Sequence, residues 1–404
     1  MLEPFDAAAT IVAAIHALPA VDVPLTGCDG LVLARDVISP VALPLWANSA
    51  MDGYACRTDD VARASADAPV TLRVVDDVRA GAFPQRPIGP GLATRIATGA
   101  PVPDGADCVV RVEDTDGGTE VVRIRDARDA GRNVRPRGED VGQNTVALAQ
   151  GTLLGPAQIS LLASVGAAWV PVHRKPRVGI VTTGDELVPV ERFNEVLAGE
   201  RIVSSNSYGL AAQVRSAGGE PVDFGIVPDD ERAVREAIER ASACDLIITS
   251  AGVSVGEADY IRRAVETLRG KLEFWRVRMR PGAPLAFGSV RGKPWIGLPG
   301  NPVSSFVTFE LFARPAIRAL LGAPHAAPRR VQVVAADAYA VSVPLTHFLR
   351  VTLEAAAHGP PRARLAGPQA SNIMSSLARA DALLIVPADH GDMREGDVLD
   401  AILI

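Results

Sequence analysis

The stretch RVGIVTTGDEL at residues 177–187 decides the fold of the central part of the chain, because an apolar run ends abruptly in a polar turn. The run predicts a strand at 178–182, and helix-length segments alternate with further apolar runs after it. This alternation predicts a mostly parallel, doubly wound α/β sheet. Strands are expected at 178–182, 222–227, 246–249, 272–278, 285–290 and 295–298, and helices at 207–217, 230–243, 258–268 and 301–320. The last helix has Asn301 as its N-cap, Pro302 at its first position and a predicted kink at Pro315.

Three loops follow strands of this predicted sheet, at residues 182–186, 249–259 and 298–304. They offer hydroxyls, glycine backbone, helix N-termini and carboxylates. Ligands of open α/β sheets bind beyond the carboxyl ends of the strands. The loops therefore predict a site for an anionic, phosphorylated ligand held together with a metal ion. For any single loop an alternative stays open, in which glycine and proline only turn the chain and the acids only cap helices.

Residues 252–256 read GVSVG, which matches the G-x-S-x-G pattern of a nucleophile elbow between a strand and a helix. A serine hydrolase using Ser254 is therefore an alternative. The histidines that follow fall in a linker and in the last β-rich region, which disfavours the hydrolase; they lie at 325, 347, 358 and 390. No G-x-G-x-x-G follows the first strand and no G-x-x-x-x-G-K-[ST] occurs, so dinucleotide and P-loop sites are excluded.

Arginines alternate in the run WRVRMRPG at 275–282. At the period of a strand, Arg276, Arg278 and Arg280 would point to one face and could bind a polyanion through bidentate hydrogen bonds. A charged edge strand that prevents aggregation is the alternative.

Length, composition and charge limit the classes of protein to which the chain can belong. Its 404 residues predict two to four domains. The net charge of −6 and the 4% of aromatic residues argue against a nucleic-acid binder. Neither a signal peptide nor a membrane span is expected, and the four cysteines are scattered without metal-ligand spacing. A cytoplasmic protein with reduced thiols is the expectation.

The flanking regions differ in texture from the centre. Short β-runs with Gly, Pro and Asp turns predict a small β-rich domain from about 40 to 151, and a small barrel or sheet at 329–404. Three early segments, at 48–55, 96–107 and 135–140, carry acids among turn residues. Taken alone, each of them indicates no more than a loop.

Taken together, eight segments resemble the MoeA family of molybdopterin molybdenumtransferases, which is related to the C-terminal domain of gephyrin. In order they are SAMDGYA, TGAPVPDGAD, RPRGED, TTGDEL, TSAGVSVGEADY, RPGAPLAFG, LPGNPVS and SNIMSSLARAD, from residue 49 to residue 381. The resemblance implies a multidomain protein of α/β and β parts. It comprises an elongated N-terminal domain (1–44 with 141–176), an inserted β-rich domain (45–140), a MogA-like α/β domain (177–326) and a C-terminal β-barrel (327–404).

The resemblance also implies an activity. The protein would take adenylylated molybdopterin, cleave it in a step dependent on Mg²⁺ or Zn²⁺, insert molybdate and release AMP. It would be a homodimer in which the β-rich domain of one chain faces the α/β domain of the other. It would contact a MogA-type adenylyltransferase and apo-molybdoenzymes transiently. A pterin-binding scaffold without turnover, like the gephyrin relative, is the alternative of another class.

Site residues follow from the matching motifs. Three acids are implied as catalytic, namely Asp52, Glu186 and Asp259. The implied metal ligands are Glu186, Asp230 and Asp259. The implied substrate-binding residues are Thr98, Asp140, Ser254, Arg276, Arg280, Pro299, Pro302 and Ser371. Where many members of the family have a second lysine in this segment, the chain has Ala283, so Arg280 is the one cation kept.

Overall fold

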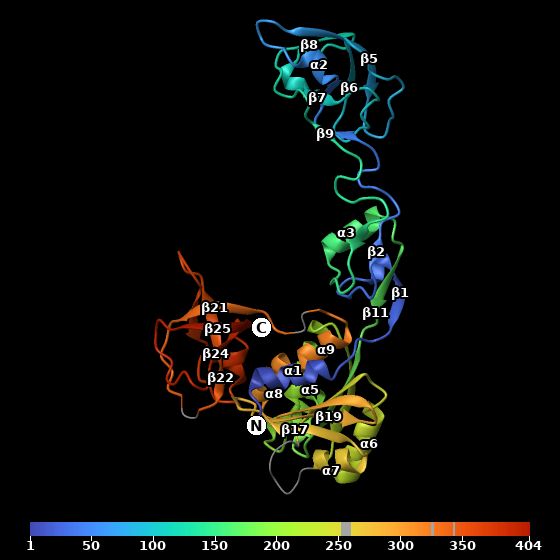
Figure 1. The fold of residues 1–404 in the computed structure, drawn as a ribbon. Coiled ribbons are helices and arrows are strands. Elements are labelled where there is room, and N and C mark those ends of the chain that lie inside the picture. Colours follow the sequence, from blue (N-terminus) through green and yellow to red (C-terminus); the bar gives the residue numbers. More distant parts are fainter. Residues whose placement is uncertain (252–259, 325–326, 342–343) are drawn as a thin grey trace.

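The computed structural model describes residues 1–251, 260–324, 327–341 and 344–404. Figure 1 shows an extended arrangement. A small β-rich domain lies at one end, a stem lies in the middle, and an α/β domain and a β-barrel lie side by side at the other end. None of the helices in the described ranges is long and apolar enough to cross a membrane.

The α/β domain is built on a six-stranded sheet in the order β15-β12-β16-β20-β19-β17. Pairing is parallel from β15 to β20 and antiparallel for the last two strands, so the predicted mostly parallel sheet is confirmed. The strands are β12 (Arg177–Thr183), β15 (Glu220–Val227), β16 (Leu246–Ser250), β17 (Lys271–Arg276), β19 (Pro284–Val290) and β20 (Lys293–Leu298). Its helices are α5 (Ser205–Ser216), α6 (Glu231–Ala241), α7 (Tyr260–Thr267), α8 (Pro302–Thr308) and α9 (Arg314–Leu320). Two short strands, β13 (Leu187–Val188) and β14 (Ile202–Val203), flank α4 (Phe193–Leu197).

The last helix differs in detail from the prediction. Between α8 and α9 the chain forms a π-helical turn, η4 (Phe309–Ala313), directly before Pro315. Proline has no N–H to donate to the preceding turn, and a π-turn absorbs the resulting mismatch. The kink predicted at Pro315 is therefore a local widening of the helix. Pro302 does occupy the first turn, but the Asn301 side chain makes no capping hydrogen bond.

Helix α1 (Pro4–Ala13) packs on the α/β domain rather than on the stem. Ala7 and Ile11 are fully buried in the same core cluster as Leu311 and Ile317. This packing differs from the predicted assignment of all of residues 1–44 to an elongated N-terminal domain. An apolar helix face is stabilised wherever a larger core can cover it, and the two-stranded sheets of the stem offer less surface.

The stem consists of two antiparallel strand pairs and a helix. Strand β1 (Ala20–Pro24) pairs with β11 (Trp169–His173), β2 (Val37–Ile38) pairs with β10 (Val146–Leu148), and α3 (Pro156–Ser164) packs beside them. Residues from both sides of the inserted domain thus meet in one small unit.

The inserted domain contains a five-stranded sheet in the order β7-β4-β6-β5-β8. The strands are β4 (Gly53–Cys56), β5 (Val70–Val78), β6 (Leu92–Ile96), β7 (Cys108–Arg111) and β8 (Val121–Ile124), with α2 (Thr58–Val61) beside them. A separate pair, β3 (Asn48–Ser49) and β9 (Val134–Arg135), closes the domain toward the stem.

The C-terminal part is a closed barrel, as predicted. Five strands form a ring in the order β22-β23-β21-β25-β24, because β24 also pairs with β22. They are β21 (Arg330–Ala335), β22 (Thr346–Glu354), β23 (Arg362–Leu365), β24 (Ala382–Val386) and β25 (Val398–Leu403), with the short α10 (Met374–Leu377). Strand β18 (Met279–Arg280) leaves the α/β domain and pairs with β22.

Candidate functional site

A cleft of about 490 Å³ lies at the carboxyl ends of the parallel strands of the α/β domain. Thr182, Thr183 and Glu186 line it from β12 and the loop that follows, and Ser250 lines it from the end of β16. The loop after β20 contributes residues 299–302. The described parts of the three predicted loops thus converge on one cavity, because parallel strands bring their carboxyl ends to the same edge of the sheet.

Thr182 contributes a buried hydroxyl group to this cleft. Its side chain is buried, and Oγ1 has no hydrogen-bond partner among the described residues. A buried polar atom without a partner costs free energy and is rare in native proteins. A ligand that enters the cleft can supply the missing partner.

Asn206 holds the loops of the cleft together, and the sequence analysis missed it. Its side-chain nitrogen donates to Ser250 Oγ at 3.0 Å and to the carbonyl oxygen of Gly300 at 2.8 Å. The loops after β16 and β20 are therefore tied to the first turn of α5. The signal available in the sequence was the run SSNS at 204–207, which follows a short apolar stretch and begins a helix.

The predicted acids of the α/β domain lie in two different settings. Glu186 lines the cleft, whereas Asp230 caps α6, where its side chain accepts a 2.9 Å hydrogen bond from the N–H of Ala233. Asp229 lies on the side of Asp185, whose Oδ1 accepts a 3.2 Å hydrogen bond from the Asp229 N–H. Burial raises the pKa of the Asp229 carboxyl, and the charges of Asp185 and Glu186 add to this rise.

No three His, Cys, Asp or Glu residues of the described chain are close enough together to hold a metal ion. Two of the predicted residues, Ser254 and Asp259, lie outside the described residues.

The prediction of three arginines on one strand face is wrong. Strand β17 ends at Arg276, and the chain turns before β18 begins at Met279 in the barrel sheet. Arg276 lines a separate pocket with the N-terminal residues Met1 and Leu2. Arg278 forms an ion pair with Glu3 at 3.1 Å. The register of the run was broken because the 277–283 segment bends to join two domains, with Val277 N–H bonded to the Ala283 carbonyl.

Arg280 and the segment after it lead back to the cleft. Arg280 is exposed at the end of β18, and Pro284, four residues later, lines the cleft. Of the three arginines, Arg280 is thus the nearest in sequence to a residue that lines the cleft.

The barrel contacts one of the loops that line the cleft. Ser371 Oγ accepts a 3.2 Å hydrogen bond from the Asn301 side chain, and its carbonyl accepts one from Val303 N–H. Pro299 and Pro302, the two predicted prolines, line the cleft beside this contact. The barrel therefore contacts the loop after β20 through the segment that begins at Ser371.

Arg350, on β22, is a second residue that the sequence analysis missed. It is fully buried, it donates to Ser376 and to the carbonyls of Pro368 and Ala370, and Nη1 has no partner among the described residues. Burial lowers the pKa of the guanidinium, and no described carboxylate forms an ion pair with it. An arginine inside the apolar run HFLRVTL was the signal in the sequence.

A second group of predicted residues lies in the inserted domain. Asp52 Oδ1 accepts two hydrogen bonds from Thr98, one from the backbone N–H at 2.6 Å and one from the hydroxyl at 2.8 Å. These bonds lower the pKa of Asp52, the backbone bond more than the hydroxyl bond. Asp52 lines a pocket of about 380 Å³ together with Arg79 and Arg95. The predicted pair Asp52 and Thr98 is thus in direct contact.

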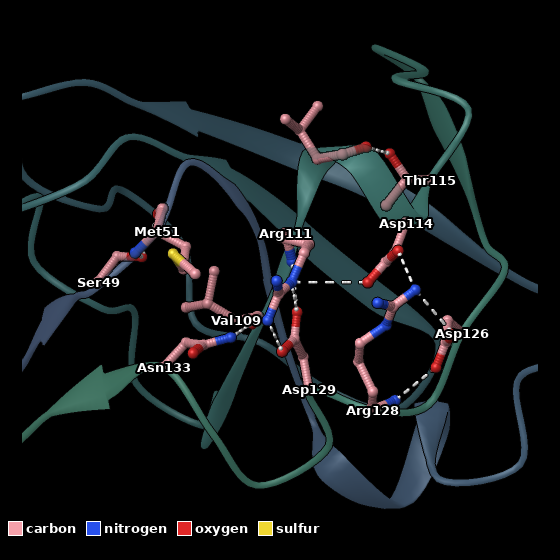
Figure 2. Close-up of polar contacts among 11 residues, drawn as sticks. Ser49, Met51, Val109, Arg111, Asp114, Thr115, Asp126, Arg128, Asp129 and Asn133 are labelled. Carbon is pink, nitrogen blue, oxygen red and sulfur yellow. Dashed lines mark hydrogen bonds and ion pairs between the residues drawn. The ribbon is translucent and has the colours of Figure 1, made fainter.

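An ion-pair network supports the strand next to Asp52. Figure 2 shows Arg111 lying between Asp129 and Asp114. Two guanidinium nitrogens of Arg111 donate to the Asp129 carboxylate at 2.8 Å each, and the Val112 N–H donates to the Asp52 carbonyl at 3.0 Å. The Arg111 guanidinium holds the pKa of the buried Asp129 carboxyl at about 2. The network therefore fixes the segment on which Asp52 depends.

The inserted domain, with Asp52 and Thr98, and the α/β domain, with the cleft, lie at opposite ends of the molecule, with the stem between them (Figure 1). Asp140 is exposed in the connection from the inserted domain back to the stem, where its N–H donates to the Leu43 carbonyl. One chain does not bring Asp52 to Glu186.

Comparison with known proteins agrees with this architecture. Residues 3–166 match the family description "MoeA N-terminal region (domain I and II)" and residues 332–404 match "MoeA C-terminal region (domain IV)". Between them, residues 179–319 match "probable molybdopterin binding domain". The chain is 40% identical over 388 residues, 94% of each chain, to molybdopterin molybdenumtransferase 2 of Mycobacterium tuberculosis. The chain belongs to the MoeA family.

Other members of the MoeA family are similar over most of their length. A molybdopterin molybdenumtransferase of Haemophilus influenzae is 34% identical over 373 residues, which is 91% of this chain and 90% of that one. Among solved structures, the molybdopterin biosynthesis MoeA protein of Pyrococcus horikoshii superposes with a TM-score of 0.86 at 28% identity and covers 100% of both chains. The MoeA-like multidomain fold therefore extends over the whole chain.

Proposed function

We propose that this MoeA-family protein is a molybdopterin molybdenumtransferase that acts in molybdenum cofactor biosynthesis. It binds adenylylated molybdopterin, inserts molybdate into the dithiolene and releases AMP. The observation that carries the proposal is the cleft at the strand ends, with its buried and unpartnered Thr182 hydroxyl, in a chain that aligns along 94% of its length with a relative of that name. We also propose the domain boundaries predicted from the sequence, with α1 packed on the α/β domain.

The acids supply the charge that such a reaction needs. Glu186, on the wall of the cleft, would hold a Mg²⁺ or Zn²⁺ ion together with Asp259. A divalent ion neutralises a phosphoanhydride and stabilises the charge that develops on the leaving phosphate. Burial raises the pKa of the nearby Asp229 carboxyl, and the charges of Asp185 and Glu186 raise it further. A cation held by Glu186 would relieve the repulsion among these three acids.

The cations would hold the oxyanions. Arg350 is buried, its Nη1 has no partner, and no described carboxylate pairs with it. Its guanidinium donates to the carbonyl of Ala370, the residue directly before Ser371. Ser371 in turn accepts a hydrogen bond from Asn301 in the loop that lines the cleft. Molybdate is a tetrahedral oxyanion of the kind that guanidinium groups bind with several hydrogen bonds. We propose Arg350, Ser371 and Arg280 as its contacts.

The active site would be shared between two chains of a homodimer. Asp52 and Thr98 belong to the inserted domain, at the opposite end of the molecule from the α/β domain that carries Glu186 (Figure 1). The pocket of one chain would therefore face the cleft of the other. The pocket arginines Arg79 and Arg95 would then meet the phosphate of the adenylate. We expect the enzyme to work in the cytoplasm and to contact a MogA-type adenylyltransferase and apo-molybdoenzymes only transiently.

Release of AMP tests the proposal directly. Purified protein is incubated with adenylylated molybdopterin, Mg²⁺ and molybdate, and AMP is measured by chromatography. The parent protein should release AMP, whereas Glu186→Gln should release little while it keeps the shape of the side chain. A parent protein that binds the substrate without release of AMP above background would support the scaffold alternative instead.

The serine-hydrolase alternative has no support in the described histidines. His390 pairs with Asp397 at 3.0 Å and His347 is buried on β22, and both lie in the barrel rather than at the edge of the α/β sheet. Ser254→Ala should therefore lower AMP release only as far as the loop contributes to binding.

A further inference from the structure

Two thiols of the inserted domain are direct neighbours across a strand pair. Cys56 on β4 and Cys108 on β7 are register partners, and their sulfur atoms lie 3.6 Å apart. Both side chains are fully buried in the core of this domain. The other two cysteines, Cys28 and Cys244, belong to the cores of the stem and of the α/β domain, so neither can pair with this dithiol inside one chain.

The two thiols are chemically unequal. Either sulfur can donate in the contact between them, and the Cys108 thiol can also donate to the Cys56 carbonyl oxygen at 3.5 Å. When the Cys56 thiol donates, the bond lowers the pKa of Cys108 against the opposing effect of burial, and the N–H of Gly131 adds to the lowering. The same hydrogen bond and burial raise the pKa of Cys56. In that arrangement Cys108 is the sulfur that loses its proton more readily, and Cys56 is the sulfur that keeps it.

We propose that Cys56 and Cys108 form a redox-active dithiol that hydroperoxides oxidise to a disulfide. In the first step the Cys108 sulfur attacks one peroxide oxygen, the O–O bond breaks, and the departing hydroxide takes up a proton and leaves as water. In the second step the Cys56 sulfur attacks the Cys108 sulfenic acid, the S–O bond breaks, and the Cys56 proton leaves with the hydroxide as a second water. Two thiols lose two electrons and two protons, and one hydrogen peroxide is reduced to two waters.

The position of the pair gives the oxidation a consequence. Strand β4 begins one residue after Asp52, and β7 ends one residue before Val112, whose N–H binds the Asp52 carbonyl. A covalent link between these strands would restrict the unfolded chain and stabilise the sheet that carries Asp52. This inference concerns a modification of the inserted domain and does not depend on the proposed transferase activity.

The test uses the full-length protein with Cys28 and Cys244 both changed to serine, so that only the pair remains. The protein is treated with hydrogen peroxide, excess oxidant is removed, and the intact mass and the peptide map are measured. We expect most chains to lose about 2 Da, the mass of two hydrogens, with the Cys56 and Cys108 peptides linked. Dithiothreitol should restore the original mass, and the oxidised form should melt at a higher temperature than the reduced form.

Two further measurements keep the result open to contradiction. The parent protein, with all four cysteines, should give the same linked peptides, which guards against a folding defect of the double variant. In Cys56→Ser, Cys108 should gain oxygen instead of forming a link. Both thiols still fully alkylated after unfolding, in the parent and in the double variant, would overturn the proposal and leave the pair as packed core side chains.

Discussion

The cleft of the α/β domain and the pocket of the inserted domain are built by different means. The cleft collects its residues from loops that a parallel sheet brings to one edge, and Asn206 ties two of these loops together. The pocket rests on a single turn contact, in which Thr98 binds the Asp52 carboxylate, and on the salt-bridged strand behind it. A general rule of α/β topology predicts the first kind of site, whereas only its motif reveals the second.

This difference has a consequence for the way the two sites can be combined. The described residues of the cleft include no set of three metal ligands. The inserted domain, whose residues line the pocket, lies beyond the stem (Figure 1). Each half folds around its own core and carries an incomplete set of groups. Under the proposal that the reaction uses both halves, a second chain would complete the site, and experiments can separate the halves by placing a lesion in each.

The largest effect is expected when the two lesions are carried by different chains of a dimer. Homodimers of Asp52→Ala and of Glu186→Ala should each release almost no AMP. In a mixed dimer with shared sites, one site carries both lesions and the other carries neither. Random assembly makes half of the dimers mixed, so the mixture should recover about a quarter of the parent activity.

The control for this experiment is a mixture in which both lesions lie in the α/β domain, Glu186→Ala with Thr182→Val, where no exchange between chains can complete a site. Mass spectrometry with two affinity tags establishes that mixed dimers are present. Mixed dimers that remain inactive would show that each site is built within one chain, and this result would contradict a site shared between the inserted domain of one chain and the α/β domain of the other.

The next effect concerns the support of the pocket. Asp129→Ala leaves Arg111 without its bidentate partner in a mostly buried position, and the inserted domain should lose about 3 kcal/mol of stability in urea unfolding. Asp126→Ala is the matched control, because Asp126 and Arg128 are both more than 40% exposed and such pairs contribute little. Equal losses in the two variants would contradict the role given to Arg111.

The same carboxylate predicts a dependence on pH. The pKa of Asp129 is lowered from 3.8 to about 2 in the folded protein, so its charge stabilises the fold above about pH 4. This stabilisation, about 2 kcal/mol, is lost as the pH falls from 4 towards 2. The stability difference between the parent and Asp129→Ala should therefore narrow by that amount over this range.

A smaller effect is expected where the cleft is tied together. Asn206→Ala removes the two hydrogen bonds to Ser250 and to the Gly300 carbonyl, so two loops lose their common anchor. The KM for adenylylated molybdopterin should rise about tenfold, the equivalent of one to two hydrogen bonds. Ser205→Ala also changes a residue of the cleft wall, but among the described residues this side chain does not join two loops, so the substitution should change the KM far less.

The fold and part of the site could be predicted from the sequence, because particular residues give local signals. Apolar runs of strand length and the helix-length segment that begins at Asp230 are local signals, so the sheet and the start of α6 could be predicted. The arginines of 276–280 could not be placed, because a strand period was assumed across a bend that only the contact between two domains imposes. Asn206 and Arg350 act through partners 44 to 94 and 18 to 26 positions away, and no local pattern contains those distances.

The smallest effects separate two neighbouring acids, Asp229 and Asp230, at the start of α6. Asp230 caps α6, so Asp230→Ala should cost about 1 kcal/mol of stability and leave the Mg²⁺ requirement of AMP release unchanged. Asp229 has a raised pKa because it is partly buried beside the charges of Asp185 and Glu186. Asp229→Asn removes one of these repelling charges, so it should leave stability unchanged or slightly higher while the Mg²⁺ concentration needed for half-maximal activity rises. The measurement is a Mg²⁺ titration of AMP release beside a urea unfolding curve for each variant. If Asp230→Ala shifted the titration and Asp229→Asn did not, the capping residue would be the metal ligand, and the cap would be the secondary role.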